Sequence, residues 1–272
     1  MSVRGPSIVR VTPGPDGPVV TDLRQEDDGS IIARDHSTGT ETRVPAHPLL
    51  GDDDPGHGVV PVHPAVAAAL RRFGDHRIGA TGTPYHDLLP VVLAQRVTSA
   101  EATAQWRRLC LRWGTPVEVG GVVLHCPPGP DVLARIPYHE MHSLGIERRR
   151  ADTLRQVAVH GHRLMEGWPL GATPQERTRA LRLIPGVGPW TAAVAGYTAF
   201  GDPDALEVGD FHAKNTVAHA LTGRHRGTDE EMCALLEPYE GDRQRVLVWL
   251  RMAGHRAPAH GARRRIVSIA RM

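Results

Sequence analysis

Residues 184–192 read Ile-Pro-Gly-Val-Gly-Pro-Trp-Thr-Ala and separate two segments with helical periodicity. Gly186 and Gly188 have no side chain, so both allow a positive φ and let another backbone come close. Pro189 suits the first turn of the next helix, where proline is favoured. The unpaired amides of that turn carry the positive end of the helix dipole and can bind a phosphate. The pattern predicts a hairpin that contacts DNA irrespective of base sequence, or else a tight turn between packed helices.

An aspartate follows this hairpin in the stretch Glu-Val-Gly-Asp-Phe-His-Ala-Lys, which occupies residues 207–214. A carboxylate can stabilise positive charge that develops in a reaction, or activate water, so Asp210 is a candidate catalytic residue. Aspartate is also a favoured helix N-cap, so a structural role is the alternative, and the two roles can coexist.

The hairpin and the aspartate together resemble the helix-hairpin-helix (HhH-GPD) superfamily of DNA glycosylases, and within it the 3-methyladenine DNA glycosylase II branch. The resemblance covers residues 63–254. Residues 93–98 resemble the end of a family helix, and residues 144–151 resemble the DNA-wedge loop and the helix after it. Two positions depart from the branch, because Arg96 replaces a second glutamine and Arg148 stands near an apolar wedge residue.

The resemblance implies a monofunctional DNA glycosylase of base-excision repair, which flips a damaged base out of duplex DNA and hydrolyses its glycosidic bond. An alkylated purine such as 3-methyladenine is the favoured substrate. Trp190 holds the position where strand-cutting relatives carry a lysine for Schiff-base chemistry, so we expect no lyase activity. Lys214 is the only lysine, and at i+4 from Asp210 it shares that helix face, where it could pair with Asp210 or hold a phosphate.

The other predicted site residues follow from the same resemblance. An electron-rich ring such as that of Trp190 attracts a cationic alkylated purine. The predicted base pocket consists of Trp190, Phe211, His212 and Gln95. The predicted DNA contacts are Pro185, Gly186, Val187, Gly188, Thr191, Lys214, Arg148 and Arg149. No cofactor is expected to be required, but the resemblance allows a structural Na+ or K+ ion on the backbone carbonyls of Arg182, Ile184 and Val187.

Two other functions fit parts of this pattern. A DNA-binding protein that kept the hairpin but lost activity would accommodate the departures at Arg96 and Arg148. A glycosylase for deaminated or oxidised bases would share the fold. The chain has three widely spaced cysteines, which excludes a four-cysteine iron–sulfur cluster within it and argues against the usual adenine-specific type.

The periodicity predicts a mostly α fold. Residues 1–62 form a small β-rich N-terminal region and linker, with strands at 7–11, 19–23 and 31–34 and a Pro/Gly/Asp-rich linker at 45–64. Residues 63–272 form a helical HhH-GPD domain, in which the resemblance implies two helical subdomains with a cleft. Helices are predicted over residues 64–73, 85–95, 99–113, 131–136, 138–144, 148–165, 174–183, 190–200, 210–221, 229–236 and 243–252.

The charge and hydropathy of the sequence limit the partners and the cellular location that can be expected. The net charge is +2, but residues 1–62 contain five arginines and ten acidic residues, so the remaining residues are basic. A basic body suits a polyanionic partner. No apolar run is long enough to span a bilayer, and the first ten residues lack a signal core. We therefore expect a monomer in the bacterial cytosol, with damaged double-stranded DNA as its partner and no membrane partner.

Overall fold

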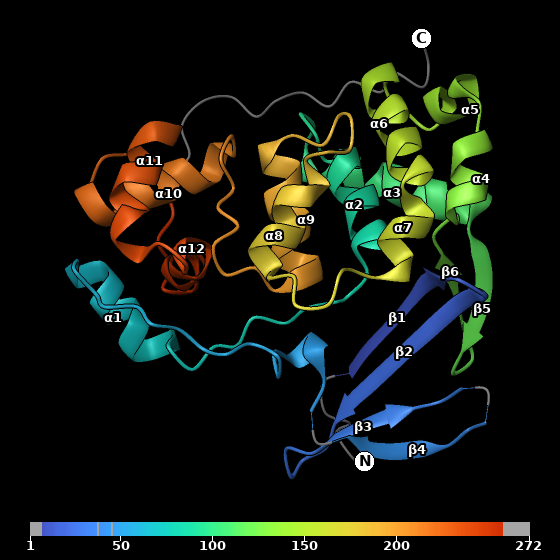
Figure 1. Cartoon of the computed structure of the whole chain (residues 1–272), viewed down its shortest axis with the longest axis horizontal. Helices are drawn as coiled ribbons and strands as arrows, with labels where there is room; N and C mark the ends of the chain where they lie inside the picture. The colour runs from blue at the N-terminus through green and yellow to red at the C-terminus, as the bar shows by residue number, and fades with distance from the viewer. Residues whose placement is uncertain (1–6, 37, 45, 258–272) are drawn as a thin grey trace. The chain divides into compact units, whose positions relative to one another are not determined.

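The computed structural model describes residues 7–36, 38–44 and 46–257, and these form two compact units. One unit contains the residues up to 47 together with 85–168, and the other contains 48–84 together with 169–257. The helices and the small N-terminal sheet confirm the predicted fold class, mostly α with a β-rich N-terminal region (Figure 1). The predicted domain boundary after residue 62 is a different division of the chain and stays a prediction.

The first unit begins with an antiparallel sheet of four strands in the order β1-β2-β3-β4. The strands are β1 (Ser7–Gly14), β2 (Gly17–Gln25), β3 (Ile31–Arg34) and β4 (Glu41–Val44). The three predicted strands are therefore present. The fourth strand was not predicted, because its sequence Glu-Thr-Arg-Val has a single apolar residue and lies almost fully exposed.

A two-stranded hairpin extends this unit. It consists of β5 (Thr115–Val119) and β6 (Val122–Cys126), and the turn between them is Gly120-Gly121, with φ of +59° and +82°. Two positive φ angles in succession are what a two-residue hairpin turn requires, and glycine adopts them without strain. Val119 and Cys126 pack against Val11 of β1, which joins the hairpin to the sheet.

The helices of the first unit are α2 (Pro84–Leu93), α3 (Ser99–Trp113), α4 (Pro130–Arg135), α5 (Tyr138–Ser143), α6 (Arg148–Val159) and α7 (Gly161–Glu166). The single helix predicted over 148–165 is thus divided in two. A Cβ atom at Gly161 would lie 2.5 Å from the ring of Pro130 and 3.0 Å from that of Tyr85, so the break allows a close approach that only glycine permits.

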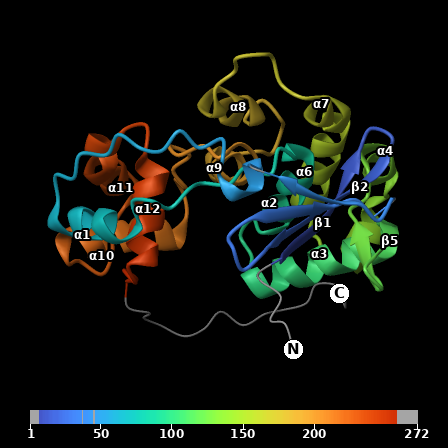
Figure 2. The same cartoon turned by 90° about the horizontal axis from the view of Figure 1, so that it is seen from below.

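The second unit contains the 3₁₀ helices η1 (Pro48–Leu50) and η2 (Glu237–Tyr239) and the α-helices α1 (Pro64–Phe73), α8 (Pro174–Leu181), α9 (Pro189–Phe200), α10 (Phe211–Thr222), α11 (Asp229–Leu236) and α12 (Arg243–Met252). Figure 2 shows α1, α10, α11 and α12 gathered together. They enclose a core around the fully buried Trp249, with Val217, Leu236 and Val246 among its members.

The predicted linker does not behave as a free linker. Its residues 48–63 belong to the second unit, where Asp54 is buried against α12. Both carboxylate oxygens of Asp54 accept hydrogen bonds from the guanidinium of Arg245, at 2.8 and 2.7 Å. The composition of this stretch is rich in turn-forming residues, and one buried ion pair is enough to hold it against a helix.

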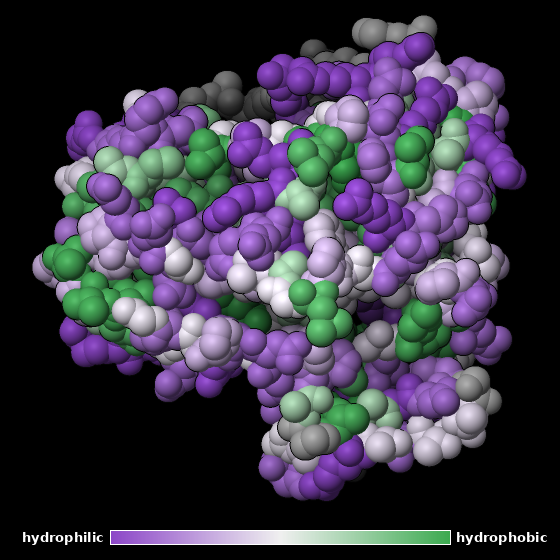
Figure 3. All heavy atoms as spheres, in the orientation of Figure 1, coloured by the Kyte–Doolittle hydropathy of each residue, from purple (hydrophilic) through white to green (hydrophobic). Residues whose placement is uncertain are grey.

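The molecular surface is mainly hydrophilic, with exposed hydrophobic residues dispersed over the face in Figure 3. Within the described part of the chain, none of the helices combines the length and the apolarity that crossing a bilayer requires.

Candidate active site

The predicted hairpin is present between α8 and α9. Ile184 and Val187 point into the second unit and are 5% exposed each, while Pro185 and Gly186 are exposed. The amide of Val187 donates to the carbonyl of Ile184 at 3.0 Å and closes the turn. Two buried apolar residues thus fix the loop and present the residues between them to solvent.

The two hairpin glycines have different conformations. Gly186 has a φ of +87°, as the sequence predicts. Gly188 instead has φ −83° and ψ 179°, which any residue can adopt, so the positive φ that glycine allows is not used at this position. Gly188 is the N-cap of α9 and offers no side chain to its first amides. No neighbour lies within 4 Å of a Cβ atom built at Gly188, so the start of α9 has room for an external acceptor.

This difference makes the two glycines a matched pair for mutation. Gly188→Ala should leave the melting temperature unchanged, because a Cβ atom there meets nothing within 4 Å. It should nevertheless weaken duplex binding, because the added methyl group stands where a DNA backbone would approach. Gly186→Ala should in addition destabilise the fold by about 1–2 kcal/mol, because L-residues disfavour positive φ. Thermal melts and fluorescence anisotropy with duplex DNA measure both effects; unchanged DNA binding in Gly188→Ala would contradict the hairpin contact.

Asp210 is the N-cap of α10. Its Oδ1 accepts hydrogen bonds from the amides of His212 and Ala213, both at 2.7 Å. Among the described residues, no hydrogen-bond donor reaches Oδ2 of Asp210. The structural role suggested by the sequence is therefore real, and it uses one carboxylate oxygen. The half-exposed side chain is held at a fixed orientation with its second oxygen available.

The extended segment before Asp210 is anchored along its length by charged residues. Asp204 accepts from Arg243 Nε at 2.8 Å, and Glu207 pairs with Arg251 through two contacts of 2.9 Å. The amide of Gly209 donates to Asp229 Oδ1 at 2.9 Å. These contacts to α11 and α12 fix where the catalytic candidate stands, and none of them is visible as a local sequence motif.

Arg251 is also close enough to Asp210 for their charges to interact. Burial disfavours its charged form, but the pair with Glu207 outweighs that effect and, with a smaller contribution from Asp210, raises the pKa of Arg251. Arg251 is thus a permanent cation near the catalytic candidate that the sequence reasoning missed.

Trp190 lies next to the same segment. A Cβ atom built on Gly209 would be 3.9 Å from the Trp190 Cβ, so the first turn of α9 contacts the residue before Asp210. Phe211 and His212 follow Asp210, and both are exposed, with their rings edge to face at 5.3 Å. Three of the four residues predicted for the base pocket therefore lie at the starts of two helices, Trp190 at the start of α9 and Phe211 and His212 at the start of α10.

Two of the DNA contacts predicted in the second unit have side chains that are paired or buried in the structure. Lys214 Nζ donates to Asp229 Oδ2 at 3.0 Å, so the predicted alternative that it pairs with Asp210 is wrong. The carboxylate that pairs with Lys214 belongs to α11. The helical spacing of Lys214 and Asp210 gives no information about a partner on another helix. Thr191 is 2% exposed, so its side chain is not presented to a phosphate in this conformation.

The remaining predicted residues belong to the first unit. Gln95 is half-buried just after α2, and exposed Arg96 has a φ of +60°, the one positive φ of a non-glycine residue in the ranges that the structure describes. Arg148 and Arg149 are exposed at the start of α6. The guanidinium of Arg148 lies 4.9 Å from the ring centroid of Tyr138, and its Nε donates to Asp152 Oδ2 at 3.3 Å.

A buried arginine organises these first-unit residues. Arg150 is 2% exposed, and its Nη1 donates to the Leu93 carbonyl at 2.8 Å and to Gln105 Oε1 at 2.6 Å. Gln105 in turn donates to the Gly145 carbonyl at 2.6 Å. The end of α2 is thereby connected to the loop before α6. Sequence reasoning missed Arg150 because it stands in a run of three arginines, of which the other two are exposed.

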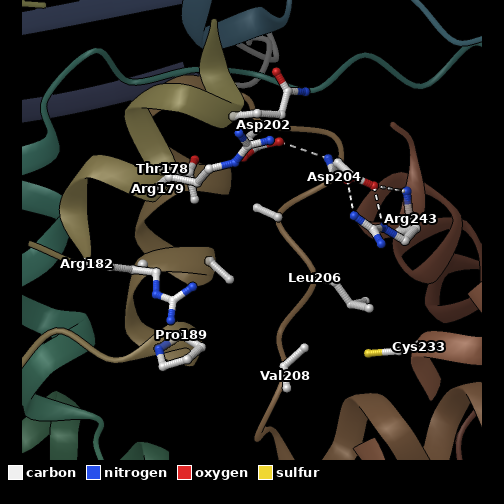
Figure 4. A pocket seen from close by; sticks show the side chains of 14 residues that line it. Thr178, Arg179, Arg182, Pro189, Asp202, Asp204, Leu206, Val208, Cys233 and Arg243 are labelled. Carbon is white, nitrogen blue, oxygen red and sulfur yellow. Dashed lines mark hydrogen bonds and ion pairs between the residues drawn. The ribbon is translucent and has the colours of Figure 1, made fainter. Parts of the chain in front are cut away.

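The second unit also contains a cavity of about 250 Å³, shown in Figure 4. Arg179 and Arg182 of α8 and its C-terminus face it from one side, and the ion pair of Asp204 with Arg243 faces it from the other. Burial raises the pKa of Asp202 in its wall. Neither Trp190 nor Asp210 lines this cavity, so it is distinct from the predicted base pocket.

The predicted cation site rests on backbone carbonyls of one turn. The Ile184 carbonyl accepts a hydrogen bond from the Val187 amide, which leaves it one further lone pair. A monovalent cation on the carbonyls of Arg182, Ile184 and Val187 stays a prediction. Among the residues that the structure describes, no three His, Cys, Asp or Glu side chains are grouped so as to hold a metal ion.

Comparison with known proteins finds DNA repair enzymes and DNA glycosylases among the proteins that this chain is similar to. No family model matches the chain. A "Probable bifunctional transcriptional activator/DNA repair enzyme AlkA" of Mycobacterium tuberculosis is 30% identical over 208 residues, which are 76% of this chain and 40% of the relative. The chain thus spans 40% of the length of that relative.

Solved structures share the fold. A 3-methyladenine DNA glycosylase from Archaeoglobus fulgidus matches with a TM-score of 0.67 and 16% identity, covering 91% of this chain and 88% of its own. A Clostridium acetobutylicum 8-oxoguanine glycosylase/lyase in complex with double-stranded DNA matches with a TM-score of 0.55 and 12% identity, covering 91% and 98%.

Proposed function

We propose that the chain is a member of the helix-hairpin-helix superfamily of DNA glycosylases and a monofunctional enzyme that excises a damaged base from double-stranded DNA. One observation carries the proposal. The Asp210 carboxylate is fixed through Oδ1, keeps Oδ2 available, and stands beside the first turn of α9, which follows the exposed hairpin residues Pro185 and Gly186.

The steps follow from this arrangement. The hairpin amides bind a DNA phosphate, and the damaged nucleotide leaves the stack, which costs a few kcal/mol or less when its pairing is already weak. As the base departs with the electrons of the C1′–N bond, the Asp210 carboxylate stabilises the positive charge that develops on the sugar. Water then attacks C1′ and loses its proton to the carboxylate, which leaves an abasic site.

An alkylated purine is the substrate class that we propose. Trp190, whose Cβ lies close to Gly209, the residue before Asp210, supplies an electron-rich ring from the first turn of α9, and such a ring attracts the positive charge of an alkylated base. Two of the similar proteins differ in substrate, since one is a 3-methyladenine glycosylase and the other an 8-oxoguanine glycosylase/lyase. Trp190 and the engaged Lys214 favour the first type, because neither offers a free amine.

A base-release screen tests this proposal. The purified chain is incubated with duplexes that contain one methylated, deaminated or oxidised base, and abasic sites are counted after alkaline cleavage. Release from the methylated duplex in preference to the other two is the expected result. Absence of release from all three would overturn the enzymatic function and leave a DNA-binding protein.

The absence of lyase activity is a separate prediction. With Lys214 bound to Asp229 and tryptophan at position 190, we expect no covalent adduct with abasic DNA after borohydride reduction. A bifunctional glycosylase run in parallel controls the trapping chemistry. A trapped complex that disappears in Lys214→Ala would contradict the monofunctional assignment.

A monovalent cation at the hairpin is part of the proposal. The carbonyls of Arg182, Ile184 and Val187 would hold Na+ or K+ and add positive charge near the phosphate site. The proposal requires no other cofactor, and it takes the protein to act as a monomer on DNA.

A further inference from the structure

The loop that joins α10 to α11 brings an additional arginine beside the candidate active site. The guanidinium carbon of Arg226 lies 5.1 Å from the centroid of the Phe211 ring. Phe211 is the residue after Asp210, and it is 58% exposed. An exposed aromatic ring with a cation over its face therefore lies one residue from the catalytic candidate.

The loop is held against α10 by a buried amide and by a glycine. Asn215 is 4% exposed; its Nδ2 donates to the Phe211 carbonyl at 2.6 Å, and its Oδ1 accepts from the Gly227 amide at 3.1 Å. A Cβ atom at Gly227 would lie 2.7 Å from the Ala218 Cβ, so only glycine allows this approach. Asn215 therefore connects the residue that carries the ring directly to the loop that carries the cation.

Arg226 differs from the neighbouring cations in its partners. Arg224, two residues earlier, pairs with Glu231, and Lys214 pairs with Asp229. Among the residues that the structure describes, Arg226 contacts the Phe211 ring and no carboxylate. A guanidinium that lies over a ring keeps its N–H donors in its own plane, directed away from the ring and free for a planar acceptor.

We propose that Arg226, held on the Phe211 ring, binds a backbone phosphate of the DNA strand next to the nucleotide presented to Asp210. The inference rests on the proposed function, because it takes DNA as the partner. A phosphate matches the fork of a guanidinium and neutralises a charge that no described carboxylate balances. Phe211 fixes the position of the Arg226 guanidinium, because the Phe211 backbone is adjacent to Asp210 and the guanidinium lies 5.1 Å from the centroid of the Phe211 ring.

The test measures DNA binding without catalysis. The full chain is titrated with a duplex containing a tetrahydrofuran abasic analogue, which has no base to release, between about 50 and about 200 mM salt. Arg226→Ala should weaken binding and reduce the magnitude of the slope of log K against log salt concentration by about 0.9, the value for one lost phosphate contact. Arg226→Lys should keep most of the slope but bind more weakly.

Two variants separate the phosphate contact from general effects of charge and fold. Arg224→Ala removes an arginine from the same loop and should leave the slope unchanged, because Glu231 already neutralises it. Phe211→Leu keeps the charge and should lower affinity with little change of slope. Equal slopes for wild type and Arg226→Ala would overturn the phosphate contact. If wild type released no base and the slope difference persisted, the glycosylase function would fail while the contact at Arg226 stood.

Discussion

Asp210→Asn should slow base release by about 10²–10³ and leave the fold and DNA binding intact. Asparagine is as good an N-cap as aspartate, so its side-chain oxygen can still accept from the amides of His212 and Ala213. The substitution therefore removes the negative charge without removing the cap. Loss of a preorganised group that stabilises charge in a transition state lowers the rate by about 10²–10³. Single-turnover release from the methylated duplex measures this loss.

Asp210→Ala provides the matched control. It removes both the charge and the cap, so it should be inactive and also less stable by about 1 kcal/mol. Comparison of the two melting temperatures with that of wild type separates the structural role from the chemical one. If Asp210→Asn released the base at the rate of wild type, Asp210 would be an N-cap only, and the catalytic assignment would fail.

The features that the sequence predicted are those fixed by neighbours in the chain. The cap at Asp210 depends on amides two and three residues further along, and the hairpin on glycine and proline preferences within residues 184–189. Amphipathic periodicity placed α9 and α10 in the same way. In these cases local physics, and not tertiary packing, determines the conformation.

The features that it missed depend on residues far apart in the sequence. The pair of Arg150 with the Leu93 carbonyl spans 57 positions, and the pair of Arg251 with Glu207 spans 44. Arginine is normally exposed, so nothing local distinguishes a buried one from its neighbours. Lys214 shows the same limit, because its helical spacing favoured Asp210, whereas folding placed the α11 carboxylate of Asp229 closer.

Arg245→Met should be the most destabilising single substitution tested in the second unit. Arg245 is 1% exposed and donates to Asp54 at 2.7 and 2.8 Å and to Asp242 at 2.6 Å. Removing one partner of a buried ion pair leaves the other charge unpaired, at a cost of about 3–5 kcal/mol. Urea unfolding at neutral pH measures the loss. Asp53→Asn changes the adjacent exposed carboxylate and should have almost no effect.

The contribution of Asp54 to the free energy of unfolding should depend on pH. Burial disfavours the charged form of Asp54, but hydrogen bonds from Arg245 and from the amides of Ile78 and Gly56 outweigh it and lower the pKa of Asp54. A lowered pKa stabilises the fold above the ordinary carboxyl pKa, and that stabilisation is lost as the pH falls through the folded value. Asp54→Asn should therefore be less stable than wild type at neutral pH, with the difference shrinking on acidification.

A double variant shows whether the ion pair itself or the unpaired charge determines stability. Replacing both partners by apolar residues leaves no buried charge, so Arg245→Met combined with Asp54→Leu should recover most of the stability lost in Arg245→Met alone. Asp242 remains half-exposed and can be solvated, so it does not cancel the recovery. If the double variant were as unstable as Arg245→Met, the pair would be holding residues 48–63 against α12 through its specific geometry, and the unpaired charge would not be the cause.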